Sequence, residues 1–412
     1  MKRSFLFLQG PCTPFFARLA AGLRGLGHAV HRLNFCAGDA LYWASQGPAQ
    51  RFVRSPGGEL DAELRATLAA LYQRHGITDQ VLFGDQRQVH LPAVAQARAQ
   101  GVRTHVFEEG YFRPAWITLE REGVNARSLL PRDIRWYQEA GPHLPEPVPQ
   151  AFAAPFYKRA THDVAYHLAG LLNPLCFPRY RTHASVSAPL EYAGYLRRFA
   201  LLRRIGAHER RRALAIANGA APYFLLPLQL NGDAQIRAHS RFTHMGQVIE
   251  LVLQSFAAHA PPQARLVIKN HPLDMGLMPY GRLISQAARR LDLQERVDYL
   301  EDGDLQTLAR QARGVVTVNS TAGLVALEQG APTLTLSDPI YNLPGLTSQM
   351  PLDAFWREAA PPDASLFASF RRCVVHATQI NGGFYCTHGM SLAVAHSLPR
   401  LLAQQSPLEQ LL

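Results

Sequence analysis

Two adjacent carboxylates, Glu108 and Glu109, follow an apolar run in the stretch HVFEEGYFRP and stand before Gly110. Like charges repel, and burial at a strand end raises the pKa of a carboxyl group, so one of the pair is suited to proton transfer. A carboxylate in that place can act as a base on an acceptor hydroxyl or as a nucleophile. Arg113 and Lys269 are candidate counter-charges. The alternative is that both glutamates are exposed turn residues.

A second group of candidates ends the apolar run ARLVI. Lys269, Asn270 and His271 stand there, and Pro272 disfavours helical geometry at the histidine. A strand-end imidazole beside a lysine suits the binding of a phosphate or the protonation of a leaving phosphate. A histidine that is hydrogen-bonded within a loop is the alternative.

A third group lies between a predicted strand and a predicted helix in TVNSTAGLVALEQG. Asn319, Ser320 and Thr321 offer hydroxyls and backbone N–H groups at a helix start, which together form a candidate phosphate site. The same hydroxyls could simply cap the helix. Glu328, further along, is a candidate for contact with a ribose diol, and the alternative is an exposed helix residue.

Polar side chains also follow the apolar run APYFLLPLQL. Gln229, Asp233 and His239 are candidates for a loop that lines a substrate cleft, with a plain surface loop as the alternative. Asp302 and Asp304 match a DxD metal pattern, but Asp304 precedes a predicted helix, so helix capping is the favoured interpretation. No metal site is predicted, and the fingerprints of P-loop ATPases and dinucleotide-binding enzymes are absent from the sequence.

Most of these candidates stand at predicted strand ends. Short apolar strands alternate with amphipathic helices in two parts of the chain, which is typical of parallel sheets that bind ligands at the carboxyl ends of their strands. The prediction is an α/β fold with two Rossmann-like domains facing a cleft, the GT-B architecture. The predicted parts are an N-terminal domain at 1–150, a basic helical insertion at 151–215, a C-terminal domain at 216–385, and a helical tail at 386–412 that packs back across both domains.

Charge and cysteine content narrow the possible partners. The 412-residue chain has a net charge of +11 and five scattered cysteines, which fits a reducing cytosol and an anionic partner. No apolar run is long enough to span a membrane. Nucleic acid is not a predicted partner, because zinc-finger and RNP-like patterns are missing. Arginines crowd residues 151–215 and suit an anionic membrane surface; a solvated face or a protein-docking surface are the alternatives.

Taken in order, three of these motifs resemble the marks of bacterial sialyltransferases and related CMP-sugar transferases. They are the acidic pair with Gly110, the pair His271-Pro272, and the pair Ser320-Thr321. The fuller strings FEEGYFRP, LQLNGDAQIRAHS, IKNHPLD and NSTAGLVALEQGAP resemble the capsule polysaccharide biosynthesis family, and within it the KpsS/LipB type of β-Kdo transferase. The resemblance extends over roughly residues 1–385.

The resemblance implies a retaining transfer of Kdo from CMP-Kdo to a phosphatidylglycerol-type lipid at the inner face of the cytoplasmic membrane. This step would start the linker for a capsule chain and would need no cofactor beyond the donor substrate. The N-terminal domain would serve the acceptor and the catalytic step, and the C-terminal domain would bind the CMP-sugar.

By motif position, Glu109 would be the catalytic carboxylate, His271 would assist departure of the CMP phosphate, and Ser320 and Thr321 would hold it. Other capsule assembly proteins are candidate partners. The alternatives are a sialic acid or other CMP-sugar transferase that acts on a saccharide, and a non-catalytic capsule export protein.

Overall fold

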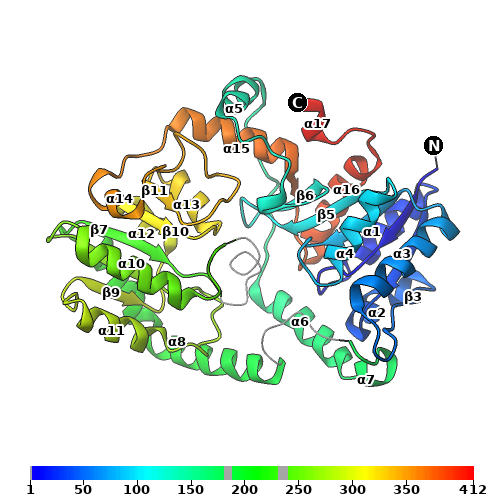
Figure 1. Cartoon of the computed structure of the whole chain (residues 1–412), viewed down its shortest axis with the longest axis horizontal. Helices are drawn as coiled ribbons and strands as arrows, with labels where there is room; N and C mark the ends of the chain where they lie inside the picture. Colours follow the sequence, from blue (N-terminus) through cyan, green and yellow to red (C-terminus); the bar gives the residue numbers. More distant parts are fainter. Residues whose placement is uncertain (1, 181–187, 231–239) are drawn as a thin grey trace. The chain divides into compact units, whose positions relative to one another are not determined.

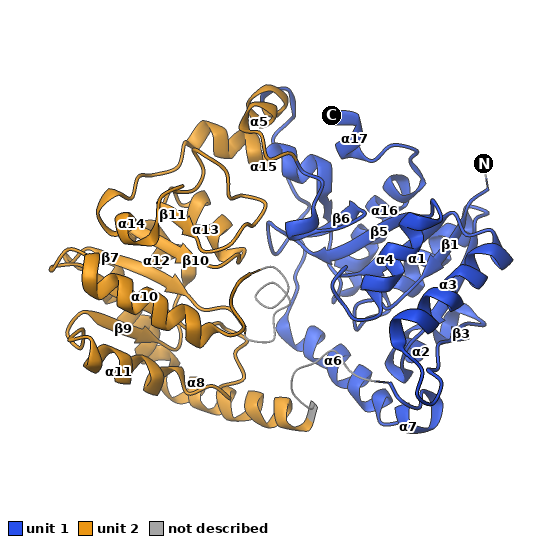
Figure 2. Ribbon diagram, viewed as in Figure 1, with its two compact units in different colours: residues 1–130, 142–183, 372–412 blue, residues 131–141, 184–371 orange. Residues whose placement is uncertain are grey.

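The computed structural model describes residues 2–180, 188–230 and 240–412, so the predicted candidates Asp233 and His239 lie outside the described residues. The chain forms two compact α/β units (Figures 1 and 2). Unit 1 consists of Met1–Leu130, Pro142–His183 and Arg372–Leu412, and unit 2 consists of Pro131–Gly141 and Ala184–Arg371.

Unit 1 is built on a seven-stranded sheet with the spatial order β12-β6-β5-β4-β1-β2-β3. Its strands are β1 (Ser4–Phe7), β2 (Ala29–Asn34), β3 (Gln50–Arg51), β4 (Asp79–Phe83), β5 (Arg103–Glu109), β6 (Trp116–Arg121) and β12 (Gln379–Asn381). Strands β1 to β5 pair in parallel, whereas β6 runs antiparallel to both β5 and β12. An edge strand of this sheet therefore comes from a segment far along the chain.

Helices pack on both faces of the unit 1 sheet (Figure 1). These are α1 (Phe15–Gly25), α2 (Ala37–Trp43), α3 (Leu60–His75), α4 (His90–Ala99) and α16 (Thr387–Leu402). The unit also contains α6 (Phe156–Gly170), α7 (Asn173–Cys176) and α17 (Pro407–Leu411). In β1, Phe5 and Phe7 share a core with side chains of α1 and α16, while Leu6 packs with α3 and α4. Successive strand side chains point to opposite faces, so burial on both sides explains the continuously apolar run SFLFL.

Unit 2 has a fully parallel five-stranded sheet with the order β11-β10-β7-β8-β9. Its strands are β7 (Tyr223–Pro227), β8 (Arg265–Lys269), β9 (Val297–Leu300), β10 (Gly314–Thr317) and β11 (Thr333–Thr335). Its helices include α5 (Ile134–Ala140), α8 (Ala188–Ala217), α10 (Met245–His259), α11 (Tyr280–Arg290), α12 (Leu305–Gln311), α13 (Ala322–Glu328), α14 (Leu352–Glu358) and most of α15 (Ala364–Thr378). Neighbouring side chains of β7 also point into different cores: Phe224 packs with α10, and Leu225 packs with α12.

The α/β class predicted for both halves of the chain is confirmed, with two Rossmann-like parallel arrangements. The predicted basic segment is divided between the units, because α6 and α7 belong to unit 1 and α8 belongs to unit 2. The C-terminal helices belong to unit 1, where Met390 and Ala393 of α16 pack in the core beside α1. Strands β6 and β12 were not predicted from the sequence.

Part of the arginine-rich helix α8 is anchored within unit 2. Arg198 is buried and forms an ion pair with Glu301, which follows β9, and Arg212 Nη2 lies 2.9 Å from Asp298 Oδ1. These arginines hold the helix against the sheet edge and are not available to an outside partner. None of the helices in the described ranges combines the length and the apolar composition that a membrane crossing requires.

Gly382 provides a test of how the C-terminal segment joins unit 1. Its φ is +147°, and a Cβ there would lie 2.4 Å from the backbone N of Ala393. We expect Gly382→Ala to lower the free energy of unfolding by about 3 kcal/mol, from strain and overpacking together. Gly25→Ala is the matched control, because nothing lies within 4 Å of its Cβ position. Urea unfolding of the two variants checks this, and equal midpoints would contradict it.

Candidate functional site

The carboxylate pair lies at the carboxyl edge of the unit 1 sheet. Strands β1, β4 and β5 are parallel neighbours, so the stretches QGPC, GD and EEG that follow them end at the same edge. Glu108 and Glu109 are the last residues of β5 and pair with Thr118 and Ile117 of β6. Both side chains are partly buried. They are strand residues, so the alternative of exposed turn residues is wrong.

Glu108 has the surroundings of a proton-transfer group. Burial raises its pKa to about 7, and the charge of Glu109 adds to the rise, while the N–H of Glu109, Arg87 and Arg113 act in the opposite direction. The Glu109 N–H donates to Glu108 Oε1 over 2.9 Å. Gly84, with φ +69°, leaves the space beside Glu108 Oε2, since a Cβ there would lie 3.0 Å from that oxygen.

Glu109 is held by two side chains that the sequence analysis did not single out. The Tyr385 hydroxyl donates to Glu109 Oε1 over 2.8 Å, and Arg159 Nη1 lies 3.5 Å from the same oxygen. The Arg159 guanidinium also stacks over the Tyr385 ring at 4.8 Å. Burial and the Glu109 charge raise the pKa of Tyr385 well above its ordinary value, so its hydroxyl remains a donor.

The two predicted counter-charges have different outcomes. Arg113 is exposed, its Nε donates to the carbonyl of Gly110 over 3.1 Å, and its charge acts to lower the pKa of Glu108. Lys269 is a buried residue of unit 2, and its nearest charged groups there include Asp302. Arg159 takes the role of counter-charge to Glu109. No sequence signal could have found it, because its α6 segment contains no motif and the pairing depends on folding.

Another buried carboxyl group lies on β6, where Glu120 pairs with Val106 of β5. Glu120 of β6 is 6% exposed and accepts hydrogen bonds from Tyr111, whose hydroxyl lies 2.8 Å from Oε1, and from the Ser128 hydroxyl. Burial raises the pKa of Glu120 to about 7, against the two hydrogen bonds that lower it and with a smaller raising effect of Asp85. The group therefore favours its neutral form in the folded protein.

In unit 2 the predicted candidates gather at one strand edge. Strands β10, β7 and β8 are adjacent and parallel, so Asn319, Gln229 and Asn270 follow neighbouring strand ends. Gln229 Nε2 donates to Asn319 Oδ1 over 3.0 Å, and the Asn319 N–H donates to Gln229 Oε1 over 3.3 Å. This reciprocal pair fixes the loops after β7 and β10 to each other.

The orientation of His271 is set by its own loop. The Leu273 N–H donates to His271 Nδ1 over 3.1 Å, so the neutral ring carries its proton on Nε2. The Asn270 side chain accepts from the His271 N–H over 2.8 Å. The neutral imidazole therefore carries an Nε2–H, which is the form that can donate a hydrogen bond to a phosphate oxygen.

Lys269 and Asn270 support this loop from inside. Lys269 is 5% exposed and donates to the carbonyl of Asn270 over 3.1 Å. Burial lowers the pKa of Lys269, partly offset by Asp302. Asn270 Nδ2 donates to Glu301 Oε2 over 3.1 Å, the carboxylate that Arg198 of α8 also binds. The strand end is thus tied to α8.

Ser320 and Thr321 precede α13 as predicted. Ser320 Oγ accepts from the Ala322 N–H over 3.1 Å, whereas Thr321 makes no side-chain capping bond. The bare face of Gly323 is filled by Tyr341, whose hydroxyl would lie 2.3 Å from a Cβ and donates to the Ser320 carbonyl. Gly323 therefore serves close packing of the protein, and Tyr341 is a support that the sequence analysis missed.

Two predicted acidic groups have clear local roles. Glu328 is the exposed last residue of α13, at the end away from Thr321, and Arg371 Nε lies 4.0 Å from its Oε1. Asp304 caps α12 by accepting from the Thr307 N–H over 2.7 Å, so the capping interpretation is confirmed. In the part of the chain that the structure describes, no three His, Cys, Asp or Glu side chains gather closely enough to hold a metal ion.

Comparison with known proteins decides the family. The model of the family described as capsule polysaccharide biosynthesis protein matches residues 78–385. The chain belongs to this family. It is 35% identical to the capsule polysaccharide export protein KpsS of Escherichia coli over 93% of this chain and 97% of that protein. It is 36% identical to the capsule polysaccharide modification protein LipB of Neisseria meningitidis serogroup B over 93% and 91%. The resemblance predicted from the motifs is confirmed.

Two solved structures are also similar to this member of the capsule family. One is the β-Kdo 2,7 transferase of Thermosulfurimonas dismutans KpsC, with 13% identity, coverage of 96% of this chain and 99% of that chain, and a TM-score of 0.44. Another is Anabaena Alr3699/HepE in complex with UDP and glucose, with 12% identity, coverage of 96% and 99%, and a TM-score of 0.31. A likeness at this level leaves function to be argued from the site.

Glu120 gives a pH test of the buried polar group. The pKa of Glu120 is about 7 in the folded protein and 4.5 in its ordinary state, so protonation of Glu120 stabilises the folded state. This contribution to the free energy of unfolding is fully present below about pH 4.5 and is lost as the pH rises through 7. Glu120→Gln stays neutral. The free energy of unfolding of the Glu120→Gln variant, minus that of wild type, should therefore rise between pH 5 and pH 8, by up to about 3 kcal/mol.

Urea unfolding at the two pH values measures this difference. Glu59→Gln, at an exposed position before α3, is the control and should show none of it. A difference for Glu120→Gln that stays constant with pH would contradict the neutral form.

Proposed function

We propose that the chain is a glycosyltransferase that moves Kdo from CMP-Kdo to a phosphatidylglycerol-type lipid, at the start of the linker for a capsular polysaccharide. The arrangement of the carboxylate pair carries the proposal. Glu109 has a cation and a tyrosine hydroxyl on one oxygen, while the neighbouring Glu108 has a pKa of about 7. Membership in the capsule family supports the setting, and the curated relatives act in capsule export and modification by their names.

The nucleotide half of the reaction is assigned to unit 2. As the bond between the anomeric carbon and the CMP phosphate breaks, its electron pair goes to the phosphate oxygen. His271 Nε2–H would donate to that oxygen, and the Ser320 and Thr321 hydroxyls would hold the other phosphate oxygens. Lys269 and Asn270 would keep the loop in place from beneath.

The sugar-transfer half is assigned to the two glutamates. In the first step Glu109 attacks the anomeric carbon and CMP leaves. In the second step the acceptor hydroxyl attacks the same carbon, the bond to Glu109 breaks, and the hydroxyl proton passes to Glu108. Two inversions give overall retention. Arg159 and Tyr385 would orient Glu109 for this attack.

A transfer assay tests this assignment. The protein is incubated with CMP-Kdo, generated in situ, and a fluorescent phosphatidylglycerol analogue, and the product is read by mass spectrometry. We expect a mass increase of one Kdo, and Glu109→Gln and His271→Ala should retain less than about 1% of the wild-type rate. Glu59→Gln and His208→Ala, both at exposed positions, are the matched controls and should remain active.

Absence of product with demonstrated donor would remove the Kdo–lipid assignment. The same assay with CMP-sialic acid and saccharide acceptors would then test transfer of another CMP-sugar. Full activity of Glu109→Gln would remove the carboxylate mechanism while leaving the substrates in place.

The pH dependence separates the two glutamates. Because Glu108 must be deprotonated to accept the acceptor proton, the rate should rise with pH and level off above an apparent pKa near 7. Glu108→Gln should be slower by about 100-fold and should lack this rise. Initial rates between pH 5.5 and pH 8.5 measure both effects. An unchanged pH profile in Glu108→Gln would assign proton transfer to another group.

We also propose that one face of α8 binds an anionic membrane, where a lipid acceptor is found. The face consists of Leu196, Ala200, Arg203, Arg204, Ala207, Arg211 and Leu214. Each of them lies three or four residues from another member, so they share one side of the helix. Leu196 is 72% exposed and Leu214 is 49% exposed. This face contains no acidic residue, and it is the side away from the buried Arg198 and Glu209.

Charge and apolar contact both favour this partner. Within the described ranges, Arg203 and Arg204 make no hydrogen bond or ion pair within the protein, unlike Arg198. Arginine stems can lie along acyl chains while their guanidinium groups meet lipid phosphates.

Vesicle sedimentation tests the membrane proposal. Each arginine near an anionic surface contributes about 1 kcal/mol, so replacing Arg203, Arg204 and Arg211 by Gln should weaken binding to phosphatidylglycerol vesicles by about 100-fold. The control changes three exposed unit 2 arginines on other elements, Arg282, Arg289 and Arg313, to Gln with the same loss of charge. Equal weakening by both triple variants would show that net charge, and not this face, determines binding.

A further inference from the structure

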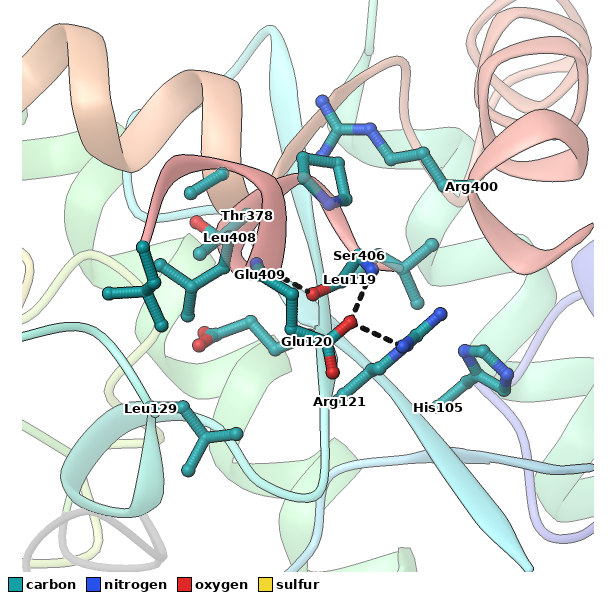
Figure 3. Close-up of a pocket in the computed structure, with 13 residues that line it drawn as sticks. His105, Leu119, Glu120, Arg121, Leu129, Thr378, Arg400, Ser406, Leu408 and Glu409 are labelled. Carbon is teal, nitrogen blue, oxygen red and sulfur yellow. Dashed lines mark hydrogen bonds and ion pairs between the residues drawn. The ribbon is translucent and has the colours of Figure 1, made fainter. Parts of the chain in front are cut away.

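A pocket lies in unit 1, away from the carboxylate pair. It is open to solvent and lies between β6 and the C-terminal residues 406–412. Figure 3 shows Leu119, Leu129 and Leu408 around it, together with Arg121 and Arg400. Ala377, Pro407 and Leu412 add to its apolar lining, and His105, Glu120 and Thr378 are among its polar lining residues.

The pocket is separated from the catalytic candidates along the strands. Arg121 of β6 pairs with His105 of β5, whereas Glu109 pairs with Ile117. Four residues along a strand correspond to about 13 Å. A ligand in this pocket would therefore occupy a different place from the sugar that reaches Glu109.

Arg400 is the unusual group in this pocket. Its Nη1 is enclosed and has no hydrogen-bond partner, and in the described part of the chain no carboxylate pairs with it. Burial alone lowers the pKa of Arg400 to about 10. Buried cations are normally paired, because an unpaired one loses its hydration without compensation.

The other arginine of the pocket is fully engaged. Arg121 Nη1 lies 2.5 Å from Glu409 Oε2, and its Nη2 donates to the Ala403 carbonyl over 2.9 Å. Figure 3 shows the Arg121–Glu409 pair and the contacts of Glu409 with Ser406. Arg121 thus has a carboxylate partner, whereas Arg400 has none in the described part of the protein.

We propose that this pocket binds an anionic amphiphile, with its apolar chain among the leucines and its carboxylate or phosphate on Arg400. A neutral apolar ligand would leave the buried guanidinium unpaired. A small inorganic anion would leave the apolar walls unfilled. The guanidinium fork suits a carboxylate or phosphate, with which it makes two parallel hydrogen bonds.

This site is additional to the substrate sites of the proposed transferase, and its test does not depend on transfer. Isothermal titration calorimetry with the full chain would compare decyl phosphate, decanoate, decanol and inorganic phosphate, each below its micelle concentration. We expect decyl phosphate and decanoate to bind with one molecule per chain. Decanol and inorganic phosphate should bind at least about tenfold more weakly, because decanol lacks the anionic group and inorganic phosphate lacks the apolar chain. Equal binding of inorganic phosphate, or of decanol, would overturn the proposal.

Variants distinguish binding at this site from nonspecific binding elsewhere on the protein. Arg400→Met should weaken decyl phosphate binding by about tenfold or more, and Leu129→Trp, at the half-exposed rim, should block entry. Arg74→Met, on the exposed surface of α3, is the matched control and should bind like wild type.

The stability of the unliganded protein gives a second readout. Because no protein partner is lost, Arg400→Met should keep or raise the melting temperature without ligand. It should also abolish the rise that decyl phosphate produces in wild type. A lower melting temperature for the unliganded variant would show that Arg400 has a structural partner and would overturn the proposal, as would unchanged binding.

Discussion

Helices cover both faces of the two sheets, and this double burial leaves polar side chains of the central strands little room except at the strand ends. Charged groups at those ends still lose much of their hydration, so each needs compensation. Glu109 receives it from Arg159 and Tyr385. Glu108 receives less, and its pKa rises instead. The difference between two chemically identical neighbours thus follows from what each side chain touches.

The sequence was sufficient for the parts of the fold that depend on local pattern. The runs VLF of β4 and LVI of β8 are apolar because both faces of these strands are buried, and the polar residues after them therefore mark strand ends. The sequence predicted parallel sheets but not the order of their strands. The contact between Gln229 and Asn319 depends on that order and was therefore not predicted. The antiparallel strands β6 and β12 escaped prediction because neither follows the βαβ rhythm.

What the sequence could not supply were partners brought together by folding. Tyr385 and Glu109 are 276 residues apart, and no spacing rule relates them. Tyr341 fills the space left by Gly323, so a glycine that suggested ligand approach is explained by a neighbouring ring. The arginines of α8 look alike in sequence, yet Arg198 and Arg212 are bound within unit 2 while Arg203 and Arg204 are exposed. Net charge therefore overstates how much positive surface is available.

The return of the chain to unit 1 has a consequence for biosynthesis. Strand β12 and Tyr385 belong to the segment Arg372–Leu412, which the ribosome makes only after all of Ala184–Arg371. At about 5–20 residues per second, that interval lasts roughly 10–40 seconds. During it, the unfinished sheet exposes the edge of β6, and Glu109 lacks its tyrosine. The nascent protein must therefore wait for the segment Arg372–Leu412 before the carboxylate site is complete. In that period an open strand edge is vulnerable to mispairing.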